Sequence, residues 1–101
     1  MDVKVEKSSE RSRYEVLADG VLAGFAEYER QGDELAFTHT EIKEEFGGQG
    51  LASKLIRAAL DDARTQGVGV LPYCPFVCGF VKKNAEYVDL VPEARRADFE
   101  L

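Results

Sequence analysis

The chain has 101 residues, of which 45% are hydrophobic and 32% charged, so it can form one compact domain with a single core but not a second lobe. Its 19 acidic and 13 basic residues give a formal net charge of −6. This charge argues against a nucleic-acid backbone as partner and mildly favours a cationic substrate. No apolar run approaches the roughly 20 residues of a membrane helix, and the first residues lack the apolar segment of a signal peptide. We therefore expect a single cytoplasmic domain over residues 1–101, with no membrane partner.

Cysteine and histidine, the usual zinc ligands, are scarce in this sequence. Cys74 and Cys78 are the only cysteines, and His39 is the only histidine. These are too few for a zinc site unless carboxylates complete it, so no metal site is expected. A cytosolic setting also disfavours a structural disulfide.

The first half of the chain alternates apolar and polar residues, which is typical of half-buried strands. The turn sequences Asp19-Gly20 and Gln31-Gly32-Asp33 separate the later strands of this half from one another. The predicted strands lie around residues 3–5 and 14–16 and over residues 22–30 and 34–42. Their order predicts a meander of four antiparallel strands.

The pattern changes to a helical period between residues 49 and 66, where charged residues fall outside the apolar face. The apolar face consists of Leu51, Ala52, Leu55, Ile56, Ala59, Leu60 and Ala63. Gly67 is suited to end this helix, and residues 68–71 are apolar enough for a buried strand. A strand, a helix and a second strand form a βαβ unit with parallel strands and a right-handed crossover. The predicted fold class is therefore α+β, with an antiparallel meander joined to a parallel βαβ unit.

The last third of the chain predicts one more helix. Pro75 is suited to its first turn, and the apolar residues after it extend to Val81. Residues 88–101 are expected to form one more strand or an extended segment followed by loose residues.

Three glycines in four residues, Gly47, Gly48 and Gly50, separate the first parallel strand from the long helix. Glycine allows backbone conformations in which several N–H groups converge on one anion at the positive end of a helix. The loop lies at the C-terminal end of its strand, which is the usual ligand position in βαβ units. The predicted ligand is therefore phosphorylated.

Two familiar phosphate loops do not match these residues. A P-loop requires Gly-Lys-Ser/Thr at the helix start, whereas Gly50 is followed by Leu51 and Ala52. A dinucleotide fingerprint requires glycine or alanine three residues after the second glycine, where Ser53 stands.

The stretch Gly47-Gly48-Gln49-Gly50-Leu51-Ala52 resembles the acyl-CoA pyrophosphate loop of GNAT-type N-acetyltransferases, Arg/Gln-x-x-Gly-x-Gly/Ala. Gly50 and Ala52 match, whereas Gly47 stands where the family usually has Arg or Gln. The likeness extends from about residue 22 to residue 87. Over this length the chain resembles the minimal GNAT subfamily. The further matching segments are His39-Thr40-Glu41-Ile42, Pro72-x-Cys74-Pro75-Phe76-Val77 and Lys82-Lys83-Asn84-x-Glu86-Tyr87.

This resemblance implies the compact GNAT core, a strongly bent sheet whose two central strands splay apart to admit the pantetheine arm of acetyl-CoA. If those strands part, the backbone groups of Glu41, Ile42 and Lys43 lack sheet partners and need others. The cofactor-binding residues that the resemblance implies are Glu41, Ile42, Gly47, Gly48, Gln49, Gly50, Leu51, Ala52 and Asn84.

Cys74 and His39 are the candidate catalytic residues. Cys74 follows the second parallel strand, near the expected thioester, and as a thiolate it could accept the acetyl group; otherwise it is a small buried hydrophobe. His39 shares a strand face with Leu35 and Phe37 by alternation, which suits a core histidine. It is also the candidate general base, because histidine titrates near neutral pH.

Four other side chains have possible roles in this framework. Tyr73 or Tyr87 could donate a proton to the leaving thiolate, as a tyrosine does in many larger GNAT enzymes. Lys82 and Lys83 could attract the nucleotide phosphates of CoA, although lysines at a helix end also complement its dipole.

The sequence thus predicts an N-acetyltransferase that moves acetyl from acetyl-CoA to an amine, either directly or through a cysteine thioester. One alternative is a non-catalytic acyl-CoA-binding or protein-interaction module, because so short a chain lacks the N-terminal helices that shape the acceptor site in larger GNAT enzymes. A second is a nucleotide-binding domain without CoA. A small amine, a polyamine and a protein amine all remain open as the acceptor.

Overall fold

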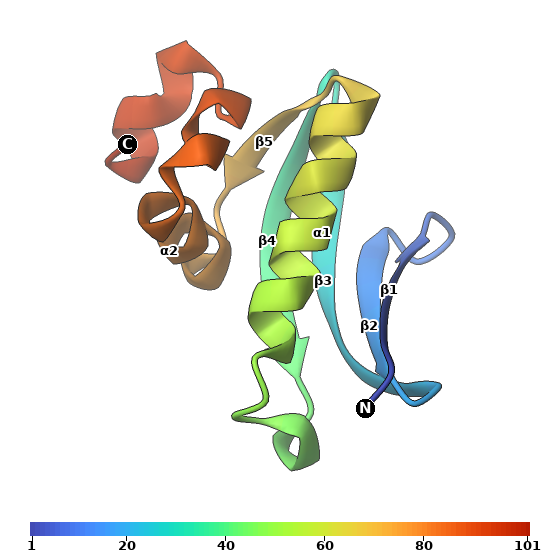
Figure 1. Ribbon diagram of the computed structural model, residues 1–101. Helices are drawn as coiled ribbons and strands as arrows, with labels where there is room; N and C mark the ends of the chain where they lie inside the picture. The colour runs from blue at the N-terminus through green and yellow to red at the C-terminus, as the bar shows by residue number, and fades with distance from the viewer.

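The computed structural model describes all residues, 1–101 (Figure 1). None of its helices is long and apolar enough to cross a membrane. In chain order the elements are β1 (Val3–Ser8), β2 (Arg13–Ala18), β3 (Val21–Gln31), β4 (Glu34–Ile42), the 3-10 helix η1 (Glu44–Phe46), α1 (Leu51–Gln66), β5 (Gly69–Pro72), α2 (Pro75–Lys83) and the 3-10 helices η2 (Ala85–Leu90) and η3 (Glu93–Phe99).

One sheet organises the chain, with the strand order β1-β2-β3-β4-β5. The first four strands pair antiparallel, and β5 pairs parallel to β4. Helix α1 connects the two parallel strands and lies across one face of the sheet, which we call the helix face (Figure 1). The predicted α+β class, with its meander and βαβ unit, is confirmed.

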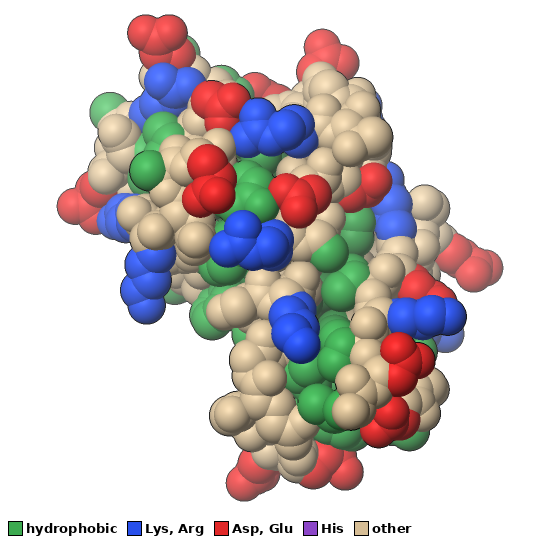
Figure 2. All heavy atoms as spheres, viewed as in Figure 1, with side chains coloured by type: hydrophobic (Ala, Val, Ile, Leu, Met, Phe, Trp, Pro, Cys, Tyr) green, Lys and Arg blue, Asp and Glu red, His purple; other side chains and the backbone are tan.

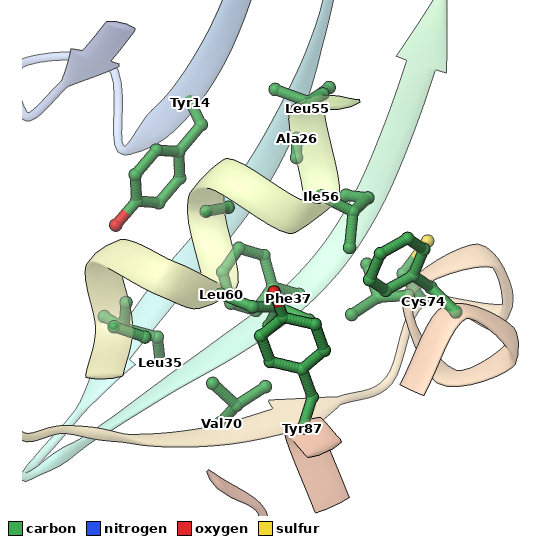
Figure 3. Close-up of a cluster of buried hydrophobic side chains, with 14 of the residues drawn as sticks. Tyr14, Ala26, Leu35, Phe37, Leu55, Ile56, Leu60, Val70, Cys74 and Tyr87 are labelled. Atoms are coloured by element: carbon green, nitrogen blue, oxygen red, sulfur yellow. The ribbon is translucent and has the colours of Figure 1, made fainter. Parts of the chain in front are cut away.

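The main core lies between α1 and the helix face. Tyr14, Phe37 and Val70 come from the sheet and pack with Leu60 of α1 (Figure 3). The helix ends at Gly67 with a φ of 72°, a left-handed conformation that glycine adopts without strain. The buried residues of α1 form a single stripe of Leu51, Leu55, Ile56, Ala59, Leu60 and Ala63.

The tail differs from the prediction of a strand or a loose segment, because it forms η2 and η3. Tyr87 and Leu90, three residues apart, both enter the main core, and this spacing suits the turn of a 3-10 helix. Phe99 packs with Ala36 and Leu71 on the opposite side of the sheet. These apolar anchors hold the tail beside β5 (Figure 1).

The prediction that His39 shares a face with Leu35 and Phe37 is wrong. Glu27 pairs with His39 and Tyr28 pairs with Phe37, so Thr38 between them has no partner and forms a bulge. The extra residue interrupts the alternation of β4. Leu35 and Phe37 therefore pack in the main core, whereas the His39 side chain is 55% exposed. Its ring lies 6.1 Å from that of Phe25, on the face opposite α1, which we call the open face.

Strands β4 and β5 part soon after they meet. Residues Glu34 to Phe37 of β4 pair with Gly69 to Pro72 of β5, and Cys74 N–H then donates to Phe37 O at 2.8 Å. Beyond Phe37, β4 continues to Ile42 paired with β3 on one side and with no strand on the side of β5. The predicted separation of the two parallel strands is therefore confirmed.

Candidate functional site

Beyond Phe37, the edge of β4 that faces away from β3 exposes backbone groups in a defined order. The Lys43 N–H donates to Ala23 O at 2.8 Å, and Ile42 lies opposite Gly24. Because antiparallel pairs alternate, Glu41 turns its N–H and C=O toward β3, whereas Thr40 and Ile42 turn theirs to the free edge. The expectation of free backbone groups is therefore supported for Ile42 and wrong for Glu41 and for the Lys43 N–H.

The glycine loop forms the N-terminal end of α1. Gly48 and Gly50 have φ values of 76° and 72°, which residues with side chains adopt only at a cost. Gly50 is the N-cap of α1, no side chain caps the helix, and its first turn contains no acidic residue. The first N–H groups of α1 therefore lack partners at the positive end of the helix, and they are available to an anion.

Two adjoining hollows extend from this loop across α1 to α2. The first has a volume of about 320 Å³ and the second of about 230 Å³. Ser53 and Phe76 belong to both, so the hollows share a boundary. The lining residues of the first are Ile42, Phe46, Gly47, Gly48, Gly50, Leu51, Ala52, Ser53 and Phe76. The second is lined by Ser53, Pro75, Phe76, Gly79, Phe80 and Lys83.

Most of the predicted cofactor residues thus surround one hollow. Ile42, the three glycines of the loop, Leu51 and Ala52 all line it, whereas Glu41, Gln49 and Asn84 do not. A Cβ added to Gly48 or Gly50 would meet no protein atom within 4 Å, so the space in front of these glycines is open. Open glycines beside a partly apolar hollow fit a phosphorylated ligand with an extended arm.

Asn84 is held within the protein instead. Its Nδ2 donates to Phe80 O at 2.9 Å, and its Oδ1 accepts from Arg57 Nη2 at 3.1 Å. These bonds cap the end of α2 and connect it to α1.

The two candidate catalytic residues lie on different sides of β4. Cys74 is the buried N-cap residue of α2, and its Sγ donates to Thr40 Oγ1 at 3.4 Å. In Figure 3 Cys74 lies at the margin of the main core, beside α2. His39 is on the open face, where its Nε2 is 3.4 Å from Glu41 Oε1. No hydrogen bond joins Cys74 to His39.

The tyrosines that could donate a proton are engaged elsewhere. The Tyr73 hydroxyl accepts from Arg95 Nη2 at 2.7 Å, and its ring packs edge-on against Phe99. The Tyr87 hydroxyl donates to Asp61 Oδ1 at 2.7 Å. Burial, together with this bond, raises the pKa of Tyr87. Neither residue lines the hollows.

The lysines and cysteines at α2 differ in position. Lys83 lines the second hollow, whereas Lys82 Nζ is 3.6 Å from Glu100 Oε1. Cys78 packs against the smaller apolar cluster of Ala36, Leu71, Val91 and Phe99, and its Sγ donates to Phe99 O at 3.5 Å. Figure 2 shows further Lys and Arg side chains along the face that carries α1.

Sequence reasoning missed Thr40 and Phe76 as residues of this site. Phe76 is 42% exposed and borders both hollows. Val77, Phe80 and Val81 already form the i, i+3, i+4 face of α2, and this pattern could have identified Phe76 as lying off that face. Nothing in the local sequence indicates the contact between Thr40 and Cys74.

Comparisons with known proteins agree with this geometry. A family model for the GCN5-related N-acetyl-transferases matches residues 13–90. No curated protein matches the chain. The solution structure of a GCN5-like protein from Staphylococcus aureus superposes with a TM-score of 0.67 at 21% identity, over 88% of this chain and 87% of that one.

Two larger enzymes solved with coenzyme A share the fold. The PaiA N-acetyltransferase of Thermoplasma acidophilum has a TM-score of 0.53 at 17% identity, over 73% of this chain and 48% of that one. The N-acetylglutamate synthase of Neisseria gonorrhoeae has a TM-score of 0.52 at 20% identity, over 97% of this chain and 26% of that one. The chain therefore spans less than half of either enzyme. Because the family model covers most of the sequence, the chain belongs to the GCN5-related N-acetyltransferase family of acetyl-CoA-dependent enzymes.

Proposed function

We propose that this protein transfers acetyl from acetyl-CoA directly to a primary amine that approaches the open face beside His39 and Glu41. One observation carries the proposal. The free edge of β4, between Phe37 and Ile42, separates a hollow beside the glycine loop from an exposed histidine on the other face. A cofactor and an acceptor could therefore approach this edge from opposite sides.

The glycine loop and the β4 edge together suit the two polar parts of the cofactor. The N–H groups around Gly50 would bind the pyrophosphate, since they lie at the positive end of α1. Thr40 and Ile42 would offer backbone N–H and C=O groups to the amides of the pantetheine arm. Acetyl-CoA supplies the acetyl group as a thioester. A backbone N–H at the β4 edge would donate to the carbonyl oxygen and stabilise the negative charge that develops on it.

The open face suits an amine acceptor. His39 would take a proton from the amine, directly or through a water, as the new nitrogen–carbon bond forms and the carbon–sulfur bond breaks. The CoA sulfur leaves as a thiolate and takes up a proton from solvent, and His39 releases the proton of the amine to solvent. Glu41 contacts His39 and Glu27 lies opposite it, so two carboxylates lie beside the place where a cationic amine would arrive.

The position of Cys74 favours direct transfer over a cysteine relay. Its thiol is buried against Thr40, and the only histidine of the chain is on the other face. A relay would need a base to form the thiolate and a path for the amine to reach the acetylated sulfur. The relay remains the second candidate because Cys74 adjoins the point where β4 and β5 part.

Intact-mass analysis after incubation with acetyl-CoA tests these alternatives. Direct transfer predicts an unmodified chain and release of free CoA thiol only when an amine is added. The panel of acceptors would contain a small amine, a polyamine, a lysine peptide and a peptide with a free N-terminus. A stable acetyl adduct on Cys74 that decays when the amine is added would support the relay. Calorimetric binding of CoA without turnover of any amine would support the non-catalytic module.

A further inference from the structure

Strand β1 is an edge strand whose backbone groups follow a fixed alternation. The Asp19 N–H donates to Asp2 O at 2.7 Å, and β1 pairs with β2 without a register shift. Every second residue of β1 from Lys4 onward therefore bonds to β2. The residues between them, Val3, Val5 and Lys7, turn their N–H and C=O groups away from the sheet.

These three outward residues are spaced symmetrically about Val5. A two-fold axis perpendicular to the sheet, just outside β1 and level with Val5, would place Val5 opposite its own copy and Val3 opposite Lys7 of the partner. All three positions would then be hydrogen-bonded pairs of an antiparallel ladder, and each would exchange two bonds. We propose that the protein forms a homodimer by antiparallel pairing of β1 with β1 of a second copy, which gives one continuous sheet.

The charges on β1 match this register. The pairing places Lys4 opposite Glu6 of the partner, and Glu6 opposite the partner's Lys4. Both positions are non-hydrogen-bonded pairs, in which opposite side chains approach most closely. Neither Lys4 nor Glu6 forms a salt bridge or a side-chain hydrogen bond within its own chain, although their side chains are exposed. Lysine on an edge strand usually prevents pairing, but in this register it has an acidic partner.

The helix face also tolerates the pairing. Val3 and Val5 are only partly buried against the core, so contact between the two Val5 side chains would cover apolar surface. Helix α1 contacts all five strands and is therefore centred near β3. Five strand spacings of about 4.8 Å separate β3 from its copy, so the two copies of α1 would lie roughly 24 Å apart. A helix is roughly 10–12 Å wide with its side chains, so the two helices would not collide.

Charge exchange provides the first test, with mass measured by light scattering over a concentration series. The wild type should approach twice the chain mass of 11.2 kDa. Lys4→Glu should weaken dimerisation by about tenfold or more, because it places two carboxylates opposite each other at both symmetric positions. Lys4→Glu combined with Glu6→Lys should restore it. Arg30→Glu, an equal charge change on the exposed end of β3, should leave it unchanged.

Amide hydrogen exchange provides the second test, because it reports which groups pair. The amides of Val5 and Lys7 should gain protection as the protein concentration rises, whereas that of Glu6, bonded to β2, should be protected throughout. Val5→Pro removes an outward N–H that the chain itself does not use, so it should give a folded monomer. A monomer at all concentrations would overturn the proposal. So would a dimer whose Val5 and Lys7 amides stay unprotected, or a Lys4→Glu variant that dimerises like the wild type.

Discussion

The thiol of Cys74 donates to the hydroxyl of Thr40 at 3.4 Å, which joins the start of α2 to β4 immediately beyond the point where β4 and β5 part. This contact crosses the separation between the two strands. The arrangement places a buried thiol on the helix face and leaves His39 exposed on the other. The direct and relay mechanisms therefore predict different effects for changes at these two residues.

Replacing Cys74 by Ala should leave a measurable rate of acetyl transfer. Direct transfer needs only the backbone donors of β4 and a base for the amine, and the substitution removes neither. Activity would be measured as release of free CoA thiol, with Cys78→Ala as the matched control because Cys78 packs away from the hollows. Complete loss of activity in Cys74→Ala alone, with CoA binding retained, would establish the relay.

Replacing His39 by Ala should lower kcat by about a hundredfold, the usual scale for a general base. The side chain is more than half exposed and makes no core contact, so the melting temperature should not change. CoA binding, measured by calorimetry, should also be the same. A loss of thermal stability with a normal rate per folded molecule would instead indicate a packing role.

Gly50→Ala and Gly20→Ala form a matched pair. Both glycines have positive φ values, 72° and 81°, and neither has a protein atom near the position of an added Cβ. Each substitution should therefore cost about 1–2 kcal/mol of unfolding free energy through backbone strain. Only Gly50→Ala should also weaken CoA binding, by about tenfold or more, because its Cβ would enter the open space that we propose for the pyrophosphate. Equal CoA affinity in both variants would show that the loop does not hold the pyrophosphate.

Tyr14→Phe should destabilise the protein at neutral pH and less so in alkali. The Tyr14 hydroxyl donates to Asp62 Oδ2 at 2.6 Å, and loss of this bond should cost about 1.5 kcal/mol. Burial, and secondarily Asp62, raises the pKa of Tyr14 far above its usual value. An unfolded tyrosine ionises near pH ~10 whereas the folded one stays neutral, so this contribution is complete below that pH and falls as the pH rises further.

Urea denaturation of wild type and Tyr14→Phe at a series of pH values measures this effect. The difference in unfolding free energy should be constant up to about pH 9 and should shrink by about 1.4 kcal/mol per pH unit above pH ~10. A difference that stays constant across the whole range would show that Tyr14 ionises equally in both states.

Local sequence patterns were sufficient for the elements that depend on local chemistry. The helical period over residues 49–66 and the glycine at its end predicted α1, because a stripe of apolar residues must be buried and Gly67 adopts a left-handed conformation at little cost. The clustered glycines predicted a loop with positive φ values before α1 for the same backbone reason, and its binding of phosphate stays a prediction. Most residues that line the first hollow could be identified this way, since all of them except Phe76 come from residues 42–53.

Tertiary structure decided the features that depend on pairing between distant segments. The bulge at Thr38 arises only where β4 meets β3, and this one unpaired residue moves His39 from the core side of the strand to the open face. The tail forms 3-10 helices because its apolar side chains are buried against helices and strands that precede it in the chain. Which backbone groups of β4 face the free edge is likewise set by the register with β3, because a shift of one residue would exchange the inward and outward groups.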